Sequence, residues 1–458
     1  VTATSYVLSN GEEVGAASTE NIRTNTNATF LQNVNVGVAI TAGKLGIGFT
    51  DTNTKIGTGA LDALTTGVNN TAVGKDALTA STSGSSHVAV GMQALKSNTT
   101  GGSNSALGYS ALEMNTTGNN NVAVGQKALE ENTTGDYNTA VGAYALDDAT
   151  TGDSNTAVGY NALTANTTAG ANTAVGYEAL KTNTTGSNLV AVGDRALTAN
   201  TTGYHNTAVG SLALDANTTA YNNTAFGFEA LTANTIGVTN TAIGSQAMEN
   251  STEGNSNTAV GYLALYSNTT GSTNTSVGDN SSVSNTTGSD NTVVGQYAFY
   301  ANTTGSDNTA VGAHALDANI GGSENVAIGR HAMTDNTTGN SNVAIGHQAL
   351  DDNTTASGNV AIGNHACMNN HDGTNLVAVG DSALENLGTS SSNNTAVGAH
   401  AMQDTTGSEY CVAVGSGALE NNTTGSYNTA VGHVALQNTT TGTENAAVGS
   451  ATLDANTT

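Results

Sequence analysis

The sequence has no proline and no tryptophan, and it has little charge and few large aromatic side chains. Among 458 residues there are 5 Phe and 14 Tyr, and charged residues make up 10%. Small residues, chiefly Asn, Thr, Gly, Ala and Ser, take their place. Such side chains cannot fill a wide core, although they can fill a thin one that is repeated many times. Because disordered chains are usually rich in charge and Pro, the composition favours a repetitive ordered chain.

Basic residues are also scarce. The chain has 9 Lys and Arg against 35 Asp and Glu, which gives a net charge of −26. Binding to nucleic acid phosphates needs clustered cations, so the composition excludes nucleic acid as a direct partner. The same charge repels anionic membrane surfaces and favours solubility. No apolar run approaches the length of a membrane span, so we expect no membrane insertion.

Cysteine is rare, with only Cys367 and Cys411. These residues lie about three coils apart in the repeat described below. At about 4.8 Å per stacked coil their separation is roughly 14 Å, which exceeds the reach of a disulfide, about 7 Å between Cα atoms. Cys367 stands where other repeats carry Leu, so we expect it to be a small core residue.

What the sequence does contain is a strict repeat. A Gly recurs every 17 residues from Gly57 to Gly380, and after one step of 18 residues the period resumes from Gly398 to Gly449. The 24 repeats follow the consensus N-T-A-V-G-x-x-A-L-x-x-N-T-T-G-x-x, of which residues 155–171 are a good example. A short fixed period over most of a chain is typical of a solenoid or fibre.

The length of the repeat limits its fold. Seventeen residues cannot hold two helices, but they fit one coil of short strands and tight corners that rises by one strand spacing. An alternative makes the Ala-Leu stretch a helical turn, which would be too short to be stable. We predict an all-β fold, a parallel β-solenoid (β-roll) of 24 coils over residues 53–458. Residues 1–52 are predicted to be a β-rich cap or connector, because an uncovered sheet edge invites stacking.

Two apolar pairs recur in each repeat, Ala-Val before the Gly and Ala-Leu after it. Neighbouring side chains on a strand point to opposite faces, so we expect each pair to place one residue inside and one outside. The outward column is interpreted as a seam with another copy of the chain, which predicts a homo-oligomer. The predicted structural core columns include Ala157, Val158, Ala162, Leu163, Ala174, Val175, Ala179 and Leu180.

Gly and Asn occupy the positions expected to form corners and polar columns. Both residues tolerate the positive φ that tight corners require, and stacked Asn side chains can form hydrogen-bonded ladders. The Asn-Thr-Thr positions also match the N-glycosylation acceptor pattern, but their strict period favours a structural ladder. The predicted corners include Gly142, Gly159, Gly176, Gly193 and Gly210, and the predicted ladders include Asn155, Asn172, Asn166, Asn183 and Asn200.

Several surface positions suggest ligands, each with a simpler alternative. His314 and His331 would lie on neighbouring coils and could share a metal ion, although the same position elsewhere holds Lys, Gln or Tyr, which favours plain surface. Tyr160 and Tyr177 follow the Gly, as do Tyr109 and Tyr262, and could stack on host surface glycans, or they could be scattered surface aromatics.

Paired carboxylates such as Asp147 and Asp148 could bind Ca²⁺, although solubility also explains them.

Ranks of Thr raise the possibility of ice binding, which needs Thr side chains on one flat face. The adjacent Thr residues of this repeat would point to opposite faces, which argues against it. Gly46-Ile-Gly48 is not followed by a helix pattern, so no phosphate-binding loop is predicted. We expect no enzyme activity, no metal and no cofactor.

The N-x-A-V-G-x-x-A-L pattern resembles the head repeats of trimeric autotransporter (YadA-like) adhesins. The form with an inserted Asn-Thr-Thr-Gly is more similar to phage tail-fibre proteins, particularly of phages that infect marine cyanobacteria. The opening segments 29–37 and 43–48 also resemble connectors of such fibres. The resemblance covers residues 53–458 and implies a left-handed β-roll with three chains around an axis.

This resemblance implies a structural fibre shaft, roughly 115 Å long at about 4.8 Å per coil. We expect a phage tail fibre or host-attachment fibre on the virion surface. Its partners would be further copies of itself, three chains in all as the resemblance implies, and other fibre or baseplate components. The alternatives are a bacterial cell-surface adhesin whose repeats bind ligand themselves, and an extracellular filament that assembles end to end.

Overall fold

The computed structural model describes residues 5–7, 13–15, 52–389 and 391–457. The chain divides into two compact units, Val1–Gly46 and Ile47–Thr458. In the first unit, strand β1 (Ser5–Val7) pairs antiparallel with β2 (Glu13–Gly15). The connector segments 29–37 and 43–48 lie outside the described residues.

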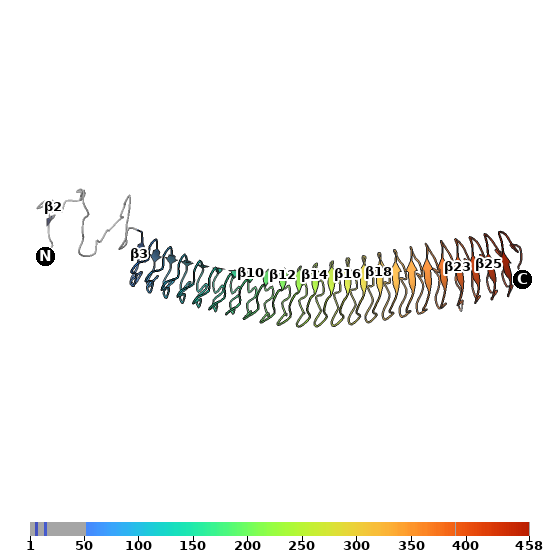
Figure 1. Cartoon of the computed structure of the whole chain (residues 1–458), viewed down its shortest axis with the longest axis horizontal. Coiled ribbons are helices and arrows are strands. Elements are labelled where there is room, and N and C mark those ends of the chain that lie inside the picture. The colour runs from blue at the N-terminus through green and yellow to red at the C-terminus, as the bar shows by residue number, and fades with distance from the viewer. Residues whose placement is uncertain (1–4, 8–12, 16–51, 390, 458) are drawn as a thin grey trace. The chain divides into compact units, whose positions relative to one another are not determined.

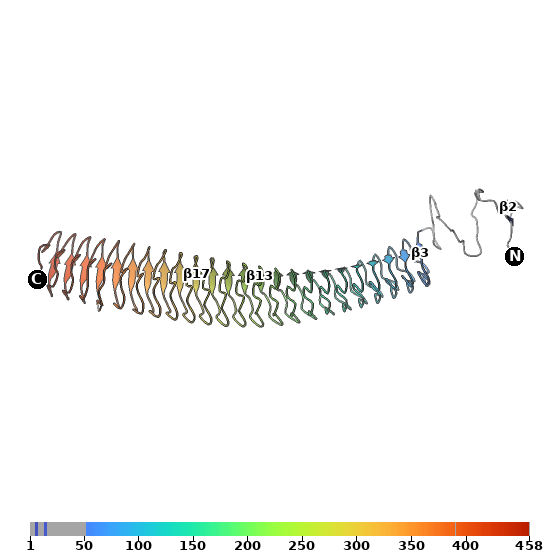
Figure 2. The same cartoon turned by 180° about the vertical axis from the view of Figure 1, so that it is seen from behind.

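The second unit is a long stack of coils, each with one three-residue strand (Figures 1 and 2). Each strand pairs in parallel with the next strand along the chain, and like positions face each other, as Thr156 faces Thr173. This all-β fold of 17-residue coils in a parallel β-solenoid confirms the predicted fold class. The 24 strands of the stack are β3 (Thr54–Ile56), β4 (Thr71–Val73), β5 (Val88–Val90), β6 (Ser105–Leu107), β7 (Val122–Val124), β8 (Thr139–Val141), β9 (Thr156–Val158), β10 (Thr173–Val175), β11 (Val190–Val192), β12 (Thr207–Val209), β13 (Thr224–Phe226), β14 (Thr241–Ile243), β15 (Thr258–Val260), β16 (Thr275–Val277), β17 (Thr292–Val294), β18 (Thr309–Val311), β19 (Val326–Ile328), β20 (Val343–Ile345), β21 (Val360–Ile362), β22 (Val377–Val379), β23 (Thr395–Val397), β24 (Val412–Val414), β25 (Thr429–Val431) and β26 (Ala446–Val448).

Hydrogen bonds between coils continue around the perimeter, well beyond the strands. The backbone N–H of Gly159 donates to the carbonyl of Val141 in the preceding coil at 2.8 Å. On the other side of the same coil, the N–H of Leu163 donates to the carbonyl of Ala179 in the following coil at 2.9 Å. Most of each coil consists of turns, not strands. Its backbone N–H and C=O groups nevertheless form hydrogen bonds with the neighbouring coils, as buried backbone groups must.

The Ala-Leu pair departs from the alternation expected of a strand. Ala162 and Leu163 are both fully buried, so the prediction of one inside and one outside is wrong for this pair. The reason is that Leu163 has a left-handed backbone conformation, with φ of 55°. The chain turns there, and both side chains point into the coil. Ala179 and Leu180 in the next coil are buried in the same way.

The Ala-Val pair does alternate, because it lies within a strand. Ala157 and Ala174 are fully buried, whereas Val158 and Val175 are half-buried on the outer face. The prediction that Val158 and Val175 belong to the core columns is therefore wrong, because both point to the outer face of the strand. The interior of a typical coil is therefore filled by two Ala and one Leu, together with Asn.

The recurrent Gly marks the closest approach between coils. Gly142, Gly159, Gly176, Gly193 and Gly210 have φ between 139° and 142°. A Cβ at Gly176 would overlap the backbone carbonyl of Gly193 in the next coil. Only Gly fits here, because any other residue would meet both an unfavourable φ and the neighbouring backbone.

One coil has a polar interior. The apolar core forms two clusters, one ending at Leu265 and the other starting at Val293. In the coil between them, Ser276, Ser281 and Ser282 replace Ala, Ala and Leu, and the hydroxyls of Ser276 and Ser281 lie 2.7 Å apart. The next coil carries the larger Val293 and the fully buried Phe299 at the equivalent positions. We expect these larger side chains to occupy the volume that the serines leave.

We predict that Gly176→Ala destabilises the coils around it by more than about 1 kcal/mol, because Ala at positive φ is strained. Gly102→Ala is the control, since its φ is not positive and an added Cβ there would meet no atom closer than 3.6 Å. Amide hydrogen exchange around each substituted residue, compared with the wild type, measures the change in local opening free energy. Equal protection in the two variants would contradict the assigned corner.

We also predict compensation between Ser282 and Phe299. Ser282→Leu alone overfills the coil, and Phe299→Leu alone leaves a void, so each lowers the local opening free energy by about 1–3 kcal/mol. The double variant should recover at least half of the summed loss. Exchange of the amides of residues 282 and 299, both bonded to the following coil, supplies the measurement. Strictly additive losses would show that the two side chains do not share space.

Candidate functional site

Two columns of Asn run through the interior of the stack. The first amide column, which includes Asn155 and Asn172, precedes each strand, and the second, which includes Asn166, Asn183 and Asn200, precedes the Thr-Thr pair. All five residues have side chains that are at least 99% buried. Buried amides are costly unless hydrogen-bonded, so their partners determine whether the stack is stable.

The first amide column binds backbone groups. The Oδ1 atom of Asn155 accepts the backbone N–H of Asn172 at 3.1 Å, and its Nδ2 atom donates to the carbonyl of Ala169 at 2.9 Å. Each Asn therefore links two parts of its own coil and joins them to the next coil. The column satisfies corner groups that the strand ladder leaves without partners.

The second amide column is a side-chain ladder along the stack. The Nδ2 atom of Asn200 donates to Oδ1 of Asn183 at 2.8 Å, and that of Asn183 donates to Oδ1 of Asn166 at 3.1 Å. The same Nδ2 atoms also donate to the carbonyls of Gly203 and Gly186. With the amide nitrogens buried and bonded in this way, a glycan on these Asn-Thr-Thr positions would require the coil to open.

Both cysteines occupy interior columns and are free thiols. Cys367 takes the place of Leu, as its phase in the repeat indicated. Cys411 replaces Asn in the first amide column, where its Sγ atom lies 3.3 Å from the carbonyl of Gly425. Burial raises the pKa of both thiols. The sequence shows the place of Cys411 as well, because it stands four residues before Gly415, as Asn155 stands before Gly159.

His87 also replaces an Asn in the first amide column and is fully buried. Its Nδ1 atom accepts the backbone N–H of Asn104 at 3.2 Å, so the ring proton lies on Nε2, 2.7 Å from the carbonyl of Gly101. Burial lowers the pKa of His87 below its ordinary value. A second proton on Nδ1 would face the N–H of Asn104 and break this bond.

Imidazole and phenol rings form a column on the outer surface of five coils. His314 stacks on Tyr297 with ring centroids 5.4 Å apart and on His331 at 5.1 Å, and His347 and His365 continue the column. Stacked rings direct their nitrogen atoms sideways and do not converge on one point. Within the described part of the chain, no group of three or more His, Cys, Asp or Glu could hold a metal ion.

The exposed tyrosines largely stack on one another. Tyr160 and Tyr177 are nearly parallel with centroids 5.7 Å apart, and Tyr204 and Tyr221 are 4.9 Å apart. A sugar that binds an aromatic residue covers a ring face, and the faces between these rings are already covered. The geometry therefore gives little support to the proposed stacking of glycans on Tyr160 and Tyr177. Tyr109 and Tyr262 are exposed singly.

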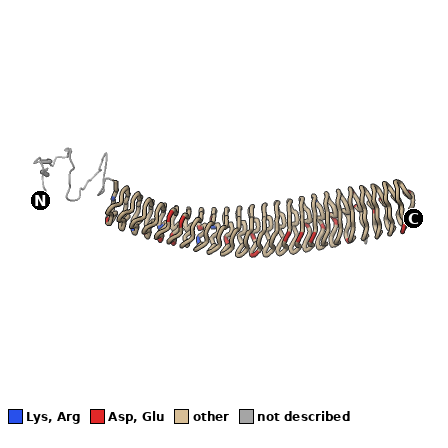
Figure 3. Tube along the Cα trace, in the orientation of Figure 1, with Lys and Arg blue, Asp and Glu red and all other residues tan. Residues whose placement is uncertain are grey.

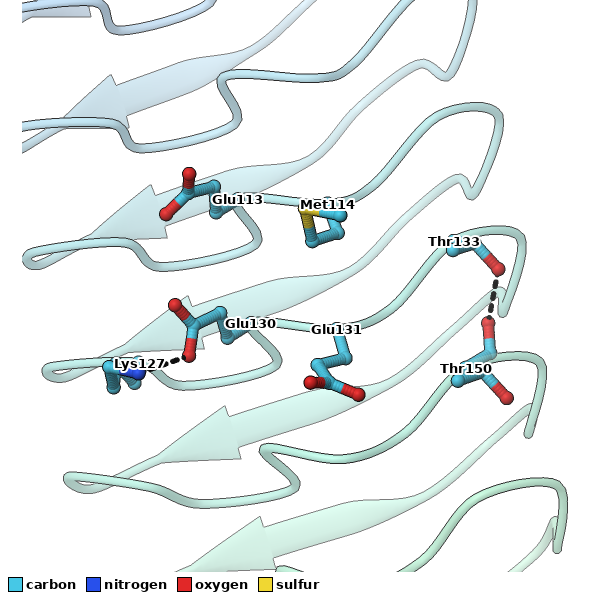
Figure 4. A pocket seen from close by; sticks show the side chains of 7 residues that line it. All are labelled: Glu113, Met114, Lys127, Glu130, Glu131, Thr133 and Thr150. Carbon is cyan, nitrogen blue, oxygen red and sulfur yellow. Dashed lines mark hydrogen bonds and ion pairs between the residues drawn. The ribbon is translucent and has the colours of Figure 1, made fainter.

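Acidic side chains line an open depression on one side of the stack (Figure 4). Glu113, Glu130 and Asp147 occupy the same position on three successive coils, and Lys127 pairs with Glu130 at 2.7 Å. Burial, and then the charges of Glu130 and Asp148, raise the pKa of Asp147 to about 7. The arrangement is a column of interacting surface charges, and it lacks the convergent oxygens that Ca²⁺ requires.

We predict a pH dependence that depends on His87. Because its pKa in the folded chain lies below the unfolded value of about 6.5, the unfolded chain takes up the proton first, and stability falls as the pH drops below 6.5. His87→Asn should keep the column bonded and remove this loss. His205→Asn, at an exposed position, is the control.

The measurement is amide exchange at residue 104 between pH 7.5 and 5, corrected for the intrinsic effect of pH on exchange. Acidification should weaken protection in the wild type and in His205→Asn, but much less in His87→Asn. A fall of the same size in all three proteins would contradict the assigned role of His87.

The described residues contain no helix long and apolar enough to cross a bilayer. Comparison with protein-family models found no match, and comparison with curated protein sequences found none either.

Proposed function

We propose that this chain is the structural shaft of a host-attachment fibre, of the kind found in phage tails, and that several copies form the shaft. The observation that carries the proposal is the register: all 24 strands are paired in parallel in chain order, without an interruption among the described residues. Twenty-three steps of about 4.8 Å give a solenoid roughly 110 Å long. A uniform stack of this length is suited to hold two objects apart.

Stiffness follows from the bonding. Separating or bending two coils strains backbone hydrogen bonds on several sides of the coil together with both amide columns, as seen around Asn155, Gly159 and Leu163. These bonds act in parallel, so local opening requires many of them to break at once. The surface offers mainly columns of polar and acidic side chains, which suits a soluble spacer.

The sequence resemblance supports a phage tail fibre on the virion surface, joined to other fibre or baseplate components. The same resemblance supports a left-handed winding and three copies, which remain proposals. A cell-surface adhesin that binds ligand through its coils is the alternative outcome of the test below, and so is a filament that grows end to end.

Electron microscopy of the full chain and of deletion variants tests the shaft. Removing residues 160–244, which is five whole repeats, should shorten the rod by about 24 Å and leave it folded. Removing residues 160–236 breaks the phase of the repeat and should disrupt the stack at the junction. Compact particles would contradict a shaft. So would rods whose length is unchanged by the deletion of residues 160–244.

Ligand binding distinguishes a shaft from an adhesin. On a glycan array, a shaft should show no binding that depends on the number of coils. Binding by the full chain that falls with the in-phase deletion would favour an adhesin, and rods of unlimited length would favour a filament.

A further inference from the structure

The outward side of the strands carries one column that is apolar throughout the stack. In each strand from β3 to β26 the first and third residues point outward, and we call these two columns the strand face. The third residue is Val, Ile, Leu or Phe in every one of the 24 strands. Many of these side chains are well exposed in the single chain, such as Phe226 at 56%, Leu107 at 51% and Ile243 at 41%.

Strand propensity does not explain this column. Thr favours strands as Val does, and Thr and Val alternate freely at the first position. At the third position Thr never occurs. Even the middle position, which forms part of the interior, is less strict, since it accepts Lys55 and Ser276 in place of Ala. If the third-position column were only exposed to solvent, nothing would require it to be more uniformly apolar than the inward middle position.

Charge is absent from the strand face as well. Neither outward column contains a charged residue in any of the 24 strands, although the chain carries a net charge of −26. The charged residues occupy other positions of the coil, as Lys127, Glu130 and Asp147 do. Figure 3 shows the charged residues of the chain as short patches along the stack. Another surface could therefore cover the strand face without burying a charge, which is a costly step.

The dimensions of the strand face identify its partner. Two columns of side chains about 10 Å wide, along roughly 110 Å, give on the order of 1,000 Å² per chain, similar to the roughly 800 Å² per partner of a stable interface. A partner must repeat every 4.8 Å or so over the same length to stay in register. A second copy of this chain has this spacing and length.

We propose that the strand faces of neighbouring copies pack against one another and form the seam of a homo-oligomer. This inference rests on the proposed multi-chain shaft and assigns the contact to particular residues. The third-position side chains, which range from intermediate burial to 74% exposure in one chain, become the buried centre of the seam. The first-position Thr and Val flank them.

A charge variant and a matched control test the seam. The seam variant is Val175→Glu, Val192→Glu and Val209→Glu together. The control is Ala165→Glu, Ala199→Glu and Ala216→Glu, which adds the same charge at a position that holds Glu131 and Asp148 in other coils. Analytical ultracentrifugation gives the mass, and circular dichroism reports whether the strands persist.

The wild type and the control should sediment as oligomers. The seam variant should weaken assembly at least about 100-fold, to the 45.3 kDa mass of one chain at micromolar concentration, with strands intact. A second variant, Val175→Thr, Val192→Thr and Val209→Thr together, keeps strand propensity and adds no charge. The Thr variant should also weaken assembly. If the Glu variant unfolds, the mass of the Thr variant tests whether the strand face forms the seam.

A monomeric wild type would overturn the seam, and so would seam variants that keep the mass of the wild type. This failure is separable from failure of the shaft. A monomer that still forms rods roughly 110 Å long would leave the shaft proposal intact, whereas an oligomer without rods would contradict the shaft.

Discussion

The structure depends on one constraint, that each residue lies against its own equivalent 17 positions along the chain. The backbone carbonyl of each recurrent Gly lies so close to the preceding coil that a Cβ there would overlap it, as between Gly176 and Gly193. Hydrogen bonds then fix the same register around the perimeter. Once one coil is placed, the next can only repeat it, which makes identical residues form columns along the whole stack.

This constraint explains the unusual composition. The interior of a coil has room for two Ala, one Leu and two amides, so large aromatic residues are excluded except where a neighbouring coil provides space, as Ser282 does beside Phe299. Corners need side chains that satisfy backbone groups, and Asn does so with both of its polar atoms. Two of the residues that replace Asn in the first amide column, His87 and Cys411, retain part of the bonding, whereas Leu189 and Leu376 do not. Charge remains on the outer positions, where it is solvated.

The period of the repeat was enough to predict the parallel solenoid of 17-residue coils, but it did not show that Ala157, and not Val158, points inward. It could not show that Leu163 turns inward beside Ala162, because alternation holds only in strands and the left-handed φ at Leu163 is a property of the turn. Equally, the two Asn phases look alike in the sequence, yet Oδ1 of Asn155 accepts a backbone N–H, whereas Oδ1 of Asn183 accepts from the side chain of Asn200. That difference depends on which polar groups each corner leaves without partners.

The central claim, that every Gly-to-Gly interval makes one coil of the same rise, can be measured directly with pairs of spin labels. Labels at the exposed residues 117 and 202 span five repeats, and labels at residues 117 and 287 span ten. Labelled chains are diluted with unlabelled ones so that only distances within one chain are measured. The stack predicts a label-to-label distance of about 24 Å for the first pair and about 48 Å for the second. Distances that do not double between the two pairs, or that fall well below these values, would contradict the stack.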